Sequence, residues 1–442
     1  MRRITPELDL FRPHQLLHKR ARELAVIDRI LVANPQMAEA VWLDLHKRVA
    51  KTGRPGLSAD QVLRAAIIKQ TYGYSYEDLA FHLADSETNR LFCGYHSPAA
   101  VPKKSALARN IKQIKAETWE KINRVLLGYA KDQDIEDGTR VRIDPTVTET
   151  NIHHPTDNKL LFDCVRVFDR LLGEASTFCT VVYCSRVRRA KRRSLQIMNA
   201  SNHTRRLAPY KDLLRVTAEM VRYAKRAVEQ LKREKEAATE RLTEEMESYI
   251  LLAEKVISQT RRRVLRGESV PALEKIVSIF EPHTDIIRKD RRDTYYGHKL
   301  TLSGGESGLI LDWVVERGNP ADVTLLKRML DRLKETYGAY PEQVAVDGGF
   351  ASKENLRVAK ELGVVDIAFA KKCGLAVSDM TSSERVYRTL RDFRAGIEGI
   401  ISFLKRVFGL RRCTWRSLAS FGSYVGASIV SANLLILARH LM

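Results

Sequence analysis

The segment TRVRIDPT changes the hydrophobic period of the chain, and this change most constrains the fold. Before it, apolar residues recur at helical spacing, but here Val141 and Ile143 alternate with polar residues that include Asp144. Alternation with a period of two is typical of a β-strand. Because proline lacks an amide hydrogen, Pro145 predicts the end of this strand, with Asp144 at its carboxyl end.

The elements after this strand follow a definite order. A long helical stretch comes first, then a hairpin signal around residues 303–308, a helix, a short apolar strand ending at Asp347, a helix, a strand and the helix that contains Glu398. Apart from the helical stretch, this is the order of an RNase H-like domain. We therefore predict an α/β fold: an RNase H-like mixed sheet with helices on both faces, a large helical insertion after the first strand, and a preceding all-α N-terminal domain.

Composition shifts and turn signals divide the chain into five predicted segments. They are an N-terminal helical arm that ends in a turn at 52–56 (1–55), a helix-turn-helix-like domain (56–135), the first part of the catalytic domain (136–185), a basic helical insertion (186–283), and the remainder of the catalytic domain with a C-terminal helix (284–442). In the second segment Ser58, Ser75 and Ser86 can each cap a helix, and Gly73 can end the first. Short helices at sharp turns suit DNA contact; the alternative is a helical bundle that touches no bases.

The charge balance narrows the choice of partner. Lys and Arg outnumber Asp and Glu by 75 to 54, which gives a net charge of +21 and favours nucleic acid or an anionic membrane surface. No uninterrupted apolar run reaches about 18 residues, and the N-terminus lacks the apolar core of a signal peptide, so nucleic acid is the expected partner. Six scattered cysteines without a CxxC pair indicate a reducing compartment, and their spacing from the histidines fits no common zinc site.

One helical face late in the chain combines a carboxylate with two cations. At about 100° per residue, Arg394 and Lys405 fall roughly 40° and 20° from Glu398, beside an apolar stripe. A carboxylate flanked by two cations at the edge of a buried stripe suits a crevice better than open water. The alternative is a solvated face with ordinary Arg–Glu support of the helix.

Three carboxylates are expected to meet at one sheet edge. Asp144 and Asp347 follow strands that, if parallel and adjacent, bring their side chains close together, and Glu398 lies on a later helix. Three carboxylates at one point repel one another unless a cation compensates them. Hard oxygen ligands favour Mg²⁺ or Mn²⁺, and a pair of such ions about 4 Å apart serves phosphoryl transfer.

The run from 186 to 206, RVRRAKRRSLQIMNASNHTRR, contains eight Lys and Arg residues and no acid. Such a run matches a phosphate backbone, although a solvated or disordered segment is the alternative. We take six of these cations as candidate DNA ligands: Arg186, Arg188, Arg189, Lys191, Arg192 and Arg193. The long helices after them could contact DNA or a second subunit.

Three stretches resemble the acidic motifs of the DDE transposases of bacterial insertion sequences: RIDPTVTETNIHHPTDNKLL, VAVDGGF and FRAGIEGIISFLK. The last resembles that group's Tyr-(2)-Arg-(3)-Glu-(6)-Lys signature through Arg394, Glu398 and Lys405, whereas Arg391 stands at the Tyr position. The stretch 57–95 resembles an N-terminal helical domain common in this group. The insertion departs from the pattern of some relatives, because it follows the first strand rather than preceding the catalytic Glu.

The resemblance implies metal-dependent cleavage of double-stranded DNA at terminal inverted repeats and strand transfer into target DNA. Asp144, Asp347 and Glu398 would bind two Mg²⁺ or Mn²⁺ ions. Arg394 and Lys405 would contact DNA phosphates, and Arg391 is a further candidate for DNA binding. We also expect a homodimer in the active complex. The expected location is the bacterial cytoplasm, in association with the nucleoid and without membrane contact. Two alternatives stay open: a metal-dependent nuclease that does not join DNA, and a non-catalytic DNA-binding protein derived from a transposase.

Overall fold

The computed structural model describes residues 18–46, 56–234, 237–289, 293–371 and 373–442. The turn expected at 52–56 therefore lies outside the described residues except for Gly56. The chain divides into two compact units, one formed by Met1–Asn151 with His298–Met442 and the other by Ile152–Gly297. We call the first the sheet unit and the second the helical unit.

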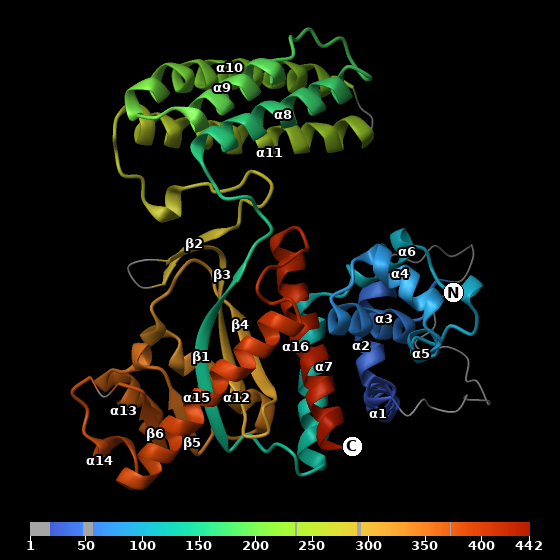
Figure 1. Cartoon of the computed structure of the whole chain (residues 1–442), viewed down its shortest axis with the longest axis vertical. Coiled ribbons are helices and arrows are strands. Elements are labelled where there is room, and N and C mark those ends of the chain that lie inside the picture. The colour runs from blue at the N-terminus through green and yellow to red at the C-terminus, as the bar shows by residue number, and fades with distance from the viewer. Residues whose placement is uncertain (1–17, 47–55, 235–236, 290–292, 372) are drawn as a thin grey trace. The chain divides into compact units, whose positions relative to one another are not determined.

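The sheet unit is built on a mixed β-sheet (Figure 1). Its strands are β1 (Arg140–Glu149), β3 (Asp293–Gly304), β4 (Ile310–Val315), β5 (Gln343–Val346) and β6 (Asp366–Phe369), of which β3 begins in the helical unit. The strands lie in the order β4, β3, β1, β5, β6, with β1, β5 and β6 parallel and β4 antiparallel to β3. The predicted mixed α/β sheet is confirmed.

Helices cover both faces of this sheet. Adjacent residues of β4 point to opposite faces: Asp312 accepts a 2.7 Å hydrogen bond from Arg332 of α12 (Leu326–Tyr337), while the Trp313 ring lies against Gly426 of α16 (Leu418–His440). α15 (Glu384–Val407) packs on β1, β5 and β6. Two shorter helices, α13 (Lys353–Glu361) and α14 (Val377–Met380), complete this part of the unit.

The predicted end of the first strand is wrong. β1 continues through Pro145 to Glu149, where Glu149 N–H donates to the Arg411 carbonyl. The parallel ladder with β5 ends at Ile143↔Val346, so Pro145 lies beyond it and needs no amide hydrogen for β5. Asp144 is therefore the first residue after the ladder rather than the last residue of the strand.

The N-terminal part of the sheet unit is helical, as predicted. It comprises α1 (Lys19–Ala33), α2 (Gln36–His46), α3 (Ala59–Tyr72), α4 (Tyr76–Asp85), α5 (Glu87–Phe92), α6 (Lys104–Ile111) and α7 (Ala116–Asp132). All three serine caps are present: Ser58 and Ser75 form capping boxes, and Ser86 accepts a hydrogen bond from the Asn89 amide. Gly73 ends α3 with φ 66°, a conformation that favours glycine.

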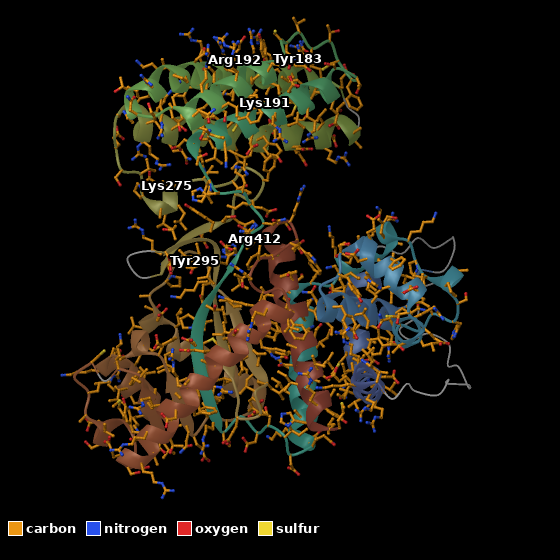
Figure 2. The ribbon with its side chains drawn as sticks, in the orientation of Figure 1. Tyr183, Lys191, Arg192, Lys275, Tyr295 and Arg412 are labelled. Carbon is orange, nitrogen blue, oxygen red and sulfur yellow. The ribbon has the colours of Figure 1, made fainter. Side chains whose placement is uncertain are left out.

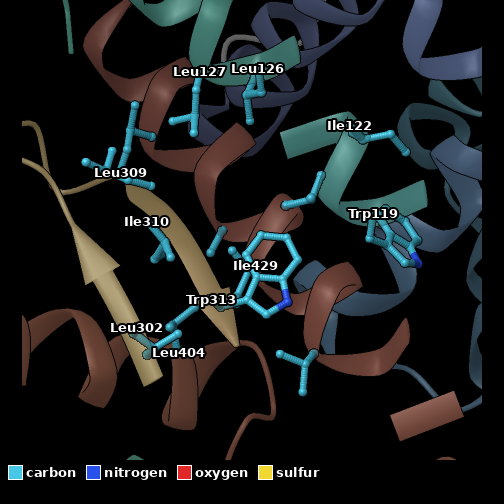
Figure 3. Packing of buried hydrophobic residues seen from close by; sticks show 14 of the residues in the cluster. Trp119, Ile122, Leu126, Leu127, Leu302, Leu309, Ile310, Trp313, Leu404 and Ile429 are labelled. Atoms are coloured by element: carbon cyan, nitrogen blue, oxygen red, sulfur yellow. The ribbon is translucent and has the colours of Figure 1, made fainter. Parts of the chain in front are cut away.

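The helices α7 and α16 and the strand β4 share one apolar core (Figure 3). A buried amide pair joins them, because Asn433 of α16 donates to Asn123 of α7 at 2.8 Å and also pairs with the Ile310 backbone of β4. By length and composition α16 could cross a membrane, but 89% of its most apolar window is buried in the protein. Its apolar residues are accounted for by the core.

The helical unit consists mainly of four packed helices (Figure 1). They are α8 (Asp157–Ala175), α9 (Val187–Asn199), α10 (His203–Leu231) and α11 (Ala237–Thr260), followed by a π-helical turn at Arg261–Leu265. β2 (Asp285–Lys289) pairs with the beginning of β3. The unit begins at Ile152, earlier than the boundary at 186, because the apolar face of α8 packs on α9, α10 and α11. An apolar stripe in sequence does not identify the element it packs against.

Close packing of α16 on α7 yields a stability prediction. A Cβ atom at Gly426 would overlap the Trp119 Cβ and lie 3.3 Å from the Trp313 ring. Gly426→Ala should therefore destabilise the protein by about 1–3 kcal/mol, as overpacking does. In the matched control Gly128→Ala, on α7 with no atom within 4 Å of the added Cβ, stability should stay the same or rise by about 0.5–1 kcal/mol. Thermal unfolding measures both, and equal melting temperatures would refute the overpacking at Gly426.

Candidate active site

The pairing of β1 with β5 places two aspartates next to each other. The parallel register aligns Ile143 with Val346, so that Asp144 and Asp347 are the next residues on their strands. Asp347 is also the first residue of a turn, since η5 (Gly348–Phe350) begins directly after it. The sequence predicts that the two aspartates lie close together if their strands are parallel neighbours, and the pairing of β1 with β5 meets this condition.

The glycines after Asp347 are required by close neighbours. A Cβ at Gly348 would come within 2.9 Å of the Lys371 side chain, and one at Gly349 within 2.7 Å of an Asp322 carboxylate oxygen. Both distances are shorter than ordinary van der Waals contact. The Gly-Gly pair therefore lets the side chains of Lys371 and Asp322 pack closely against the backbone just after Asp347.

Arg394 of α15 contacts all three candidate carboxylates. Its Nη2 lies 3.6 Å from Asp144 Oδ2 and 3.2 Å from Asp347 Oδ1, and its Nη1 lies 3.1 Å from Glu398 Oε1. The Arg–Glu helix support considered from sequence is therefore present, but the same guanidinium also reaches two strands. Since one nitrogen contacts both aspartates, their oxygens lie well within the roughly 10 Å that a two-metal site permits.

Exposure rises across this cluster from the sheet to the solvent. The side chain of Asp144 is 12% exposed, Arg394 18%, Asp347 40% and Glu398 66%. Within the described residues no three Asp, Glu, His or Cys side chains are close enough to ligate one ion directly. In this cluster the Arg394 guanidinium contacts all three carboxylates. The cluster is an anionic site whose charge is compensated by a side chain.

Two further candidates, Lys405 and Arg391, lie on α15. Lys405 is half-buried and lies two turns after Glu398 on the same helix. Arg391 is mostly exposed, and its ion pair is with the neighbouring Asp392, at 3.6 Å. Arg394 is the signature cation that pairs with all three carboxylates.

The basic run from 186 to 206 is not uncompensated, which corrects the expectation from sequence. Arg186 forms a two-bonded pair with Glu219 at 2.7 and 3.2 Å, and Arg189 and Arg193 both bond Asp212. The hydrogen bonds from these arginines lower the pKa of Asp212 to about 2, so these pairs persist through the neutral range. Both acids lie on α10, after the end of the run in sequence, where this helix packs against α9.

The remaining three candidates of α9 are exposed. Arg188, Lys191 and Arg192 line a groove of about 1010 Å³ between α9 and the first turns of α10, together with Arg205. Figure 2 shows Lys191 and Arg192 on this helical unit. The exposed cations, rather than the whole run, are available to an anionic partner.

The helices that resembled a DNA reader are placed differently from what base contact requires. Residues 62–70 of α3 are all buried, so this helix cannot enter a DNA groove. α4 exposes Glu77, Asp78 and Phe81, and acidic residues repel phosphates. Any base contact by residues 57–95 is therefore restricted to the exposed parts of α4, α5 and their turns.

Sequence reasoning missed two residues beside the site. Arg142, two residues before Asp144, is buried, and its Nη1 donates a 2.9 Å hydrogen bond to the Phe393 carbonyl of α15. Gly396 of α15 leaves the space that this guanidinium occupies. A buried cation on the same strand face as a candidate acid was the available signal.

Comparisons with protein families agree on one class. Residues 281–434 match the family described as Transposase DDE domain, and residues 14–113 match the family described as Transposase domain (DUF772). The first match contains Asp347, Glu398 and all of α15, whereas Asp144 precedes it. No similarity to a curated protein or to a solved structure reaches significance. The chain therefore belongs to the DDE transposases of insertion sequences, proteins that move mobile DNA elements.

Proposed function

We propose that this transposase cleaves double-stranded DNA at the terminal inverted repeats of its element and transfers the cut strand into target DNA. The observation that carries the proposal is the convergence of Asp144, Asp347 and Glu398 on one guanidinium at the end of the β1–β5 ladder. We assign the mixed sheet to the RNase H-like class, in which a site of this kind lies at the carboxyl ends of adjacent parallel strands.

The chemistry of the donor set fits two divalent cations. Three carboxylates supply the hard oxygen ligands that Mg²⁺ and Mn²⁺ prefer, and a cationic group already occupies the point where they meet. When bound, such ions would activate an attacking oxygen and stabilise the leaving oxygen. Asp144, Asp347 and Glu398 would hold them, and Arg394 would have to leave the centre of the cluster.

The cations of α15 would then position the DNA. Arg394, displaced from the carboxylates, would present a guanidinium fork to a phosphate near the scissile bond, while Lys405 would act as a point charge. Arg391, exposed on the same helix, is a further phosphate ligand in this proposal. Orientation of the scissile phosphate is worth several kcal/mol of barrier in such reactions.

The three carboxylates provide the first test. Asp144→Asn, Asp347→Asn and Glu398→Gln should each abolish cleavage, because each removes a ligand of the two metal ions. The melting temperature and the affinity for DNA should stay near wild type. Glu384→Gln, at the exposed start of α15, is the matched control and should cleave normally. Loss of DNA binding together with cleavage in all three would instead indicate a structural role.

The same assay separates the proposed function from its alternatives. Joining of a pre-cut 3′-hydroxyl end into plasmid DNA by the wild type, and not by Glu398→Gln, is the expected result. Cleavage without joining would identify a nuclease. Sequence-specific binding without cleavage or joining would identify a DNA-binding protein derived from a transposase. The DNA that flanks the coding region supplies the terminal repeats to use as substrate.

Displacement of Arg394 provides a second test. In Arg394→Gln the metal-free carboxylates lose the positive charge that this guanidinium supplies, so the melting temperature should fall and Mg²⁺ should restore it at a lower concentration than in wild type. Joining should still fall by orders of magnitude, because the phosphate fork is removed. Arg394→Lys should preserve the melting temperature but not joining. An unchanged Mg²⁺ dependence in Arg394→Gln would contradict the displacement.

The groove between α9 and α10 is our candidate for DNA backbone contact outside the active site. Arg188, Lys191, Arg192 and Arg205 converge on it, whereas Arg186, Arg189 and Arg193 contribute mainly by holding α9 on α10. We place the protein on the bacterial nucleoid in the cytoplasm, as a homodimer when two element ends are joined.

Salt dependence tests this groove. Neutralising Arg188, Lys191 and Arg192 to Gln should weaken binding to all DNA sequences and flatten the slope of log K against log salt by about 0.9 for each DNA phosphate that is no longer neutralised. The control variant neutralises three cations of the same unit that are paired with glutamates of a neighbouring helix: Arg170, Lys225 and Lys232. It removes equal charge, so equal slopes in the two variants would rule out direct binding of phosphates by the groove.

A further inference from the structure

Arg142 connects the strand of Asp144 to the helix of Glu398. Strand alternation puts Arg142 on the same face of β1 as Asp144, and its Nη1 donates to the Phe393 carbonyl at 2.9 Å. Its guanidinium carbon also lies 4.5 Å from the centre of the Phe393 ring, a cation–π distance. Arg142 is 8% exposed, so these contacts are made away from solvent.

Gly396 leaves the space for this side chain, and Gly304 lies in ordinary contact with it. A Cβ at Gly396 would overlap Arg142 Nη1, and a Cβ at Gly304 of β3 would lie 3.6 Å from Arg142 Nε and 3.2 Å from Ile400. Gly396 stands midway between Arg394 and Glu398 in the sequence of α15. The guanidinium thus lies between its strand and α15, where it stacks on the Phe393 ring and fills the space left by the missing side chain of Gly396.

The apolar contacts of α15 do not by themselves fix its register. Leu390, Ile397 and Leu404 are buried, but apolar burial is non-directional and tolerates a small slide or rotation of the helix. A buried hydrogen bond to one carbonyl, combined with ring stacking, is directional and selects one position. Glu398 itself is mostly exposed and has little packing of its own.

We propose that Arg142 is a positioning residue that sets the register of α15 against β1, with Gly396 as its required partner, and thereby fixes Glu398 and Arg394 relative to Asp144. For the role of Glu398 as a metal ligand this inference rests on the proposed function. Loss of a contact that orients a metal ligand typically lowers the metal affinity by about 10- to 100-fold.

The test uses the full-length protein and Mn²⁺, followed by electron paramagnetic resonance, with Arg142→Gln, Gly396→Ala and the double variant. Each single variant should bind Mn²⁺ about 10- to 100-fold more weakly, and the double variant should be no weaker than Arg142→Gln, because Gly396→Ala acts only by expelling the guanidinium. Gly399→Ala, with no atom within 4 Å of its Cβ, is the control and should bind as wild type does.

Hydrogen exchange of the α15 amides around residues 393–398 gives a second readout that needs no metal. Exchange should be faster in Arg142→Gln and Gly396→Ala than in Gly399→Ala. Additive effects in the double variant, or Gly396→Ala behaving like Gly399→Ala in both measurements, would overturn the inference. If wild type shows no Mn²⁺ site that Asp144→Asn removes, the proposed metal function fails, while hydrogen exchange still decides the positioning role. Should Arg142→Gln not fold, Gly396→Ala alone decides by the same comparison.

Discussion

The parallel pairing of β1 with β5 is the constraint on which the site depends. Its register ends at Ile143↔Val346, so two carboxylates leave the sheet at the same point. Two anions at one edge require a compensating cation, and Arg394 of α15 provides it while it also pairs with Glu398. The rest of the sheet unit supports this arrangement: α16, α7 and β4 share one core, and the Gly-Gly pair after Asp347 lets Lys371 and Asp322 pack closely there.

Much of this could be predicted from the sequence because it depends on local patterns. Serine caps and Gly73 marked the N-terminal helices, period-two alternation marked β1, and the spacing of Arg394, Glu398 and Lys405 identified one face of α15. The order of the elements indicated that Asp144 and Asp347 would meet if β1 and β5 were parallel neighbours, as the structure shows they are. These are properties of short segments or of connectivity, and both can be seen without coordinates.

What could not be predicted depends on which segments meet in space. Asp212 and Glu219 form ion pairs with three of the six candidate cations at α9, although both acids lie on the next helix. The strand passes Pro145 because the β5 ladder has already ended there. In the sequence Arg142 looked like one more polar residue of a strand. Its role depends on α15, which lies far along the chain: its hydrogen-bond partner Phe393 is 251 residues away.

The proposed chemistry follows from one property, the joint binding of a pair of metal ions by Asp144, Asp347 and Glu398. The most direct measurement is electron paramagnetic resonance of the full-length protein with Mn²⁺ and DNA from the flank of the coding region. We expect an exchange-coupled pair of ions in wild type, as for a separation of about 4 Å, and its absence in Asp144→Asn. Only uncoupled Mn²⁺, or a coupled pair that survives Asp144→Asn, would show that these carboxylates do not share two metals.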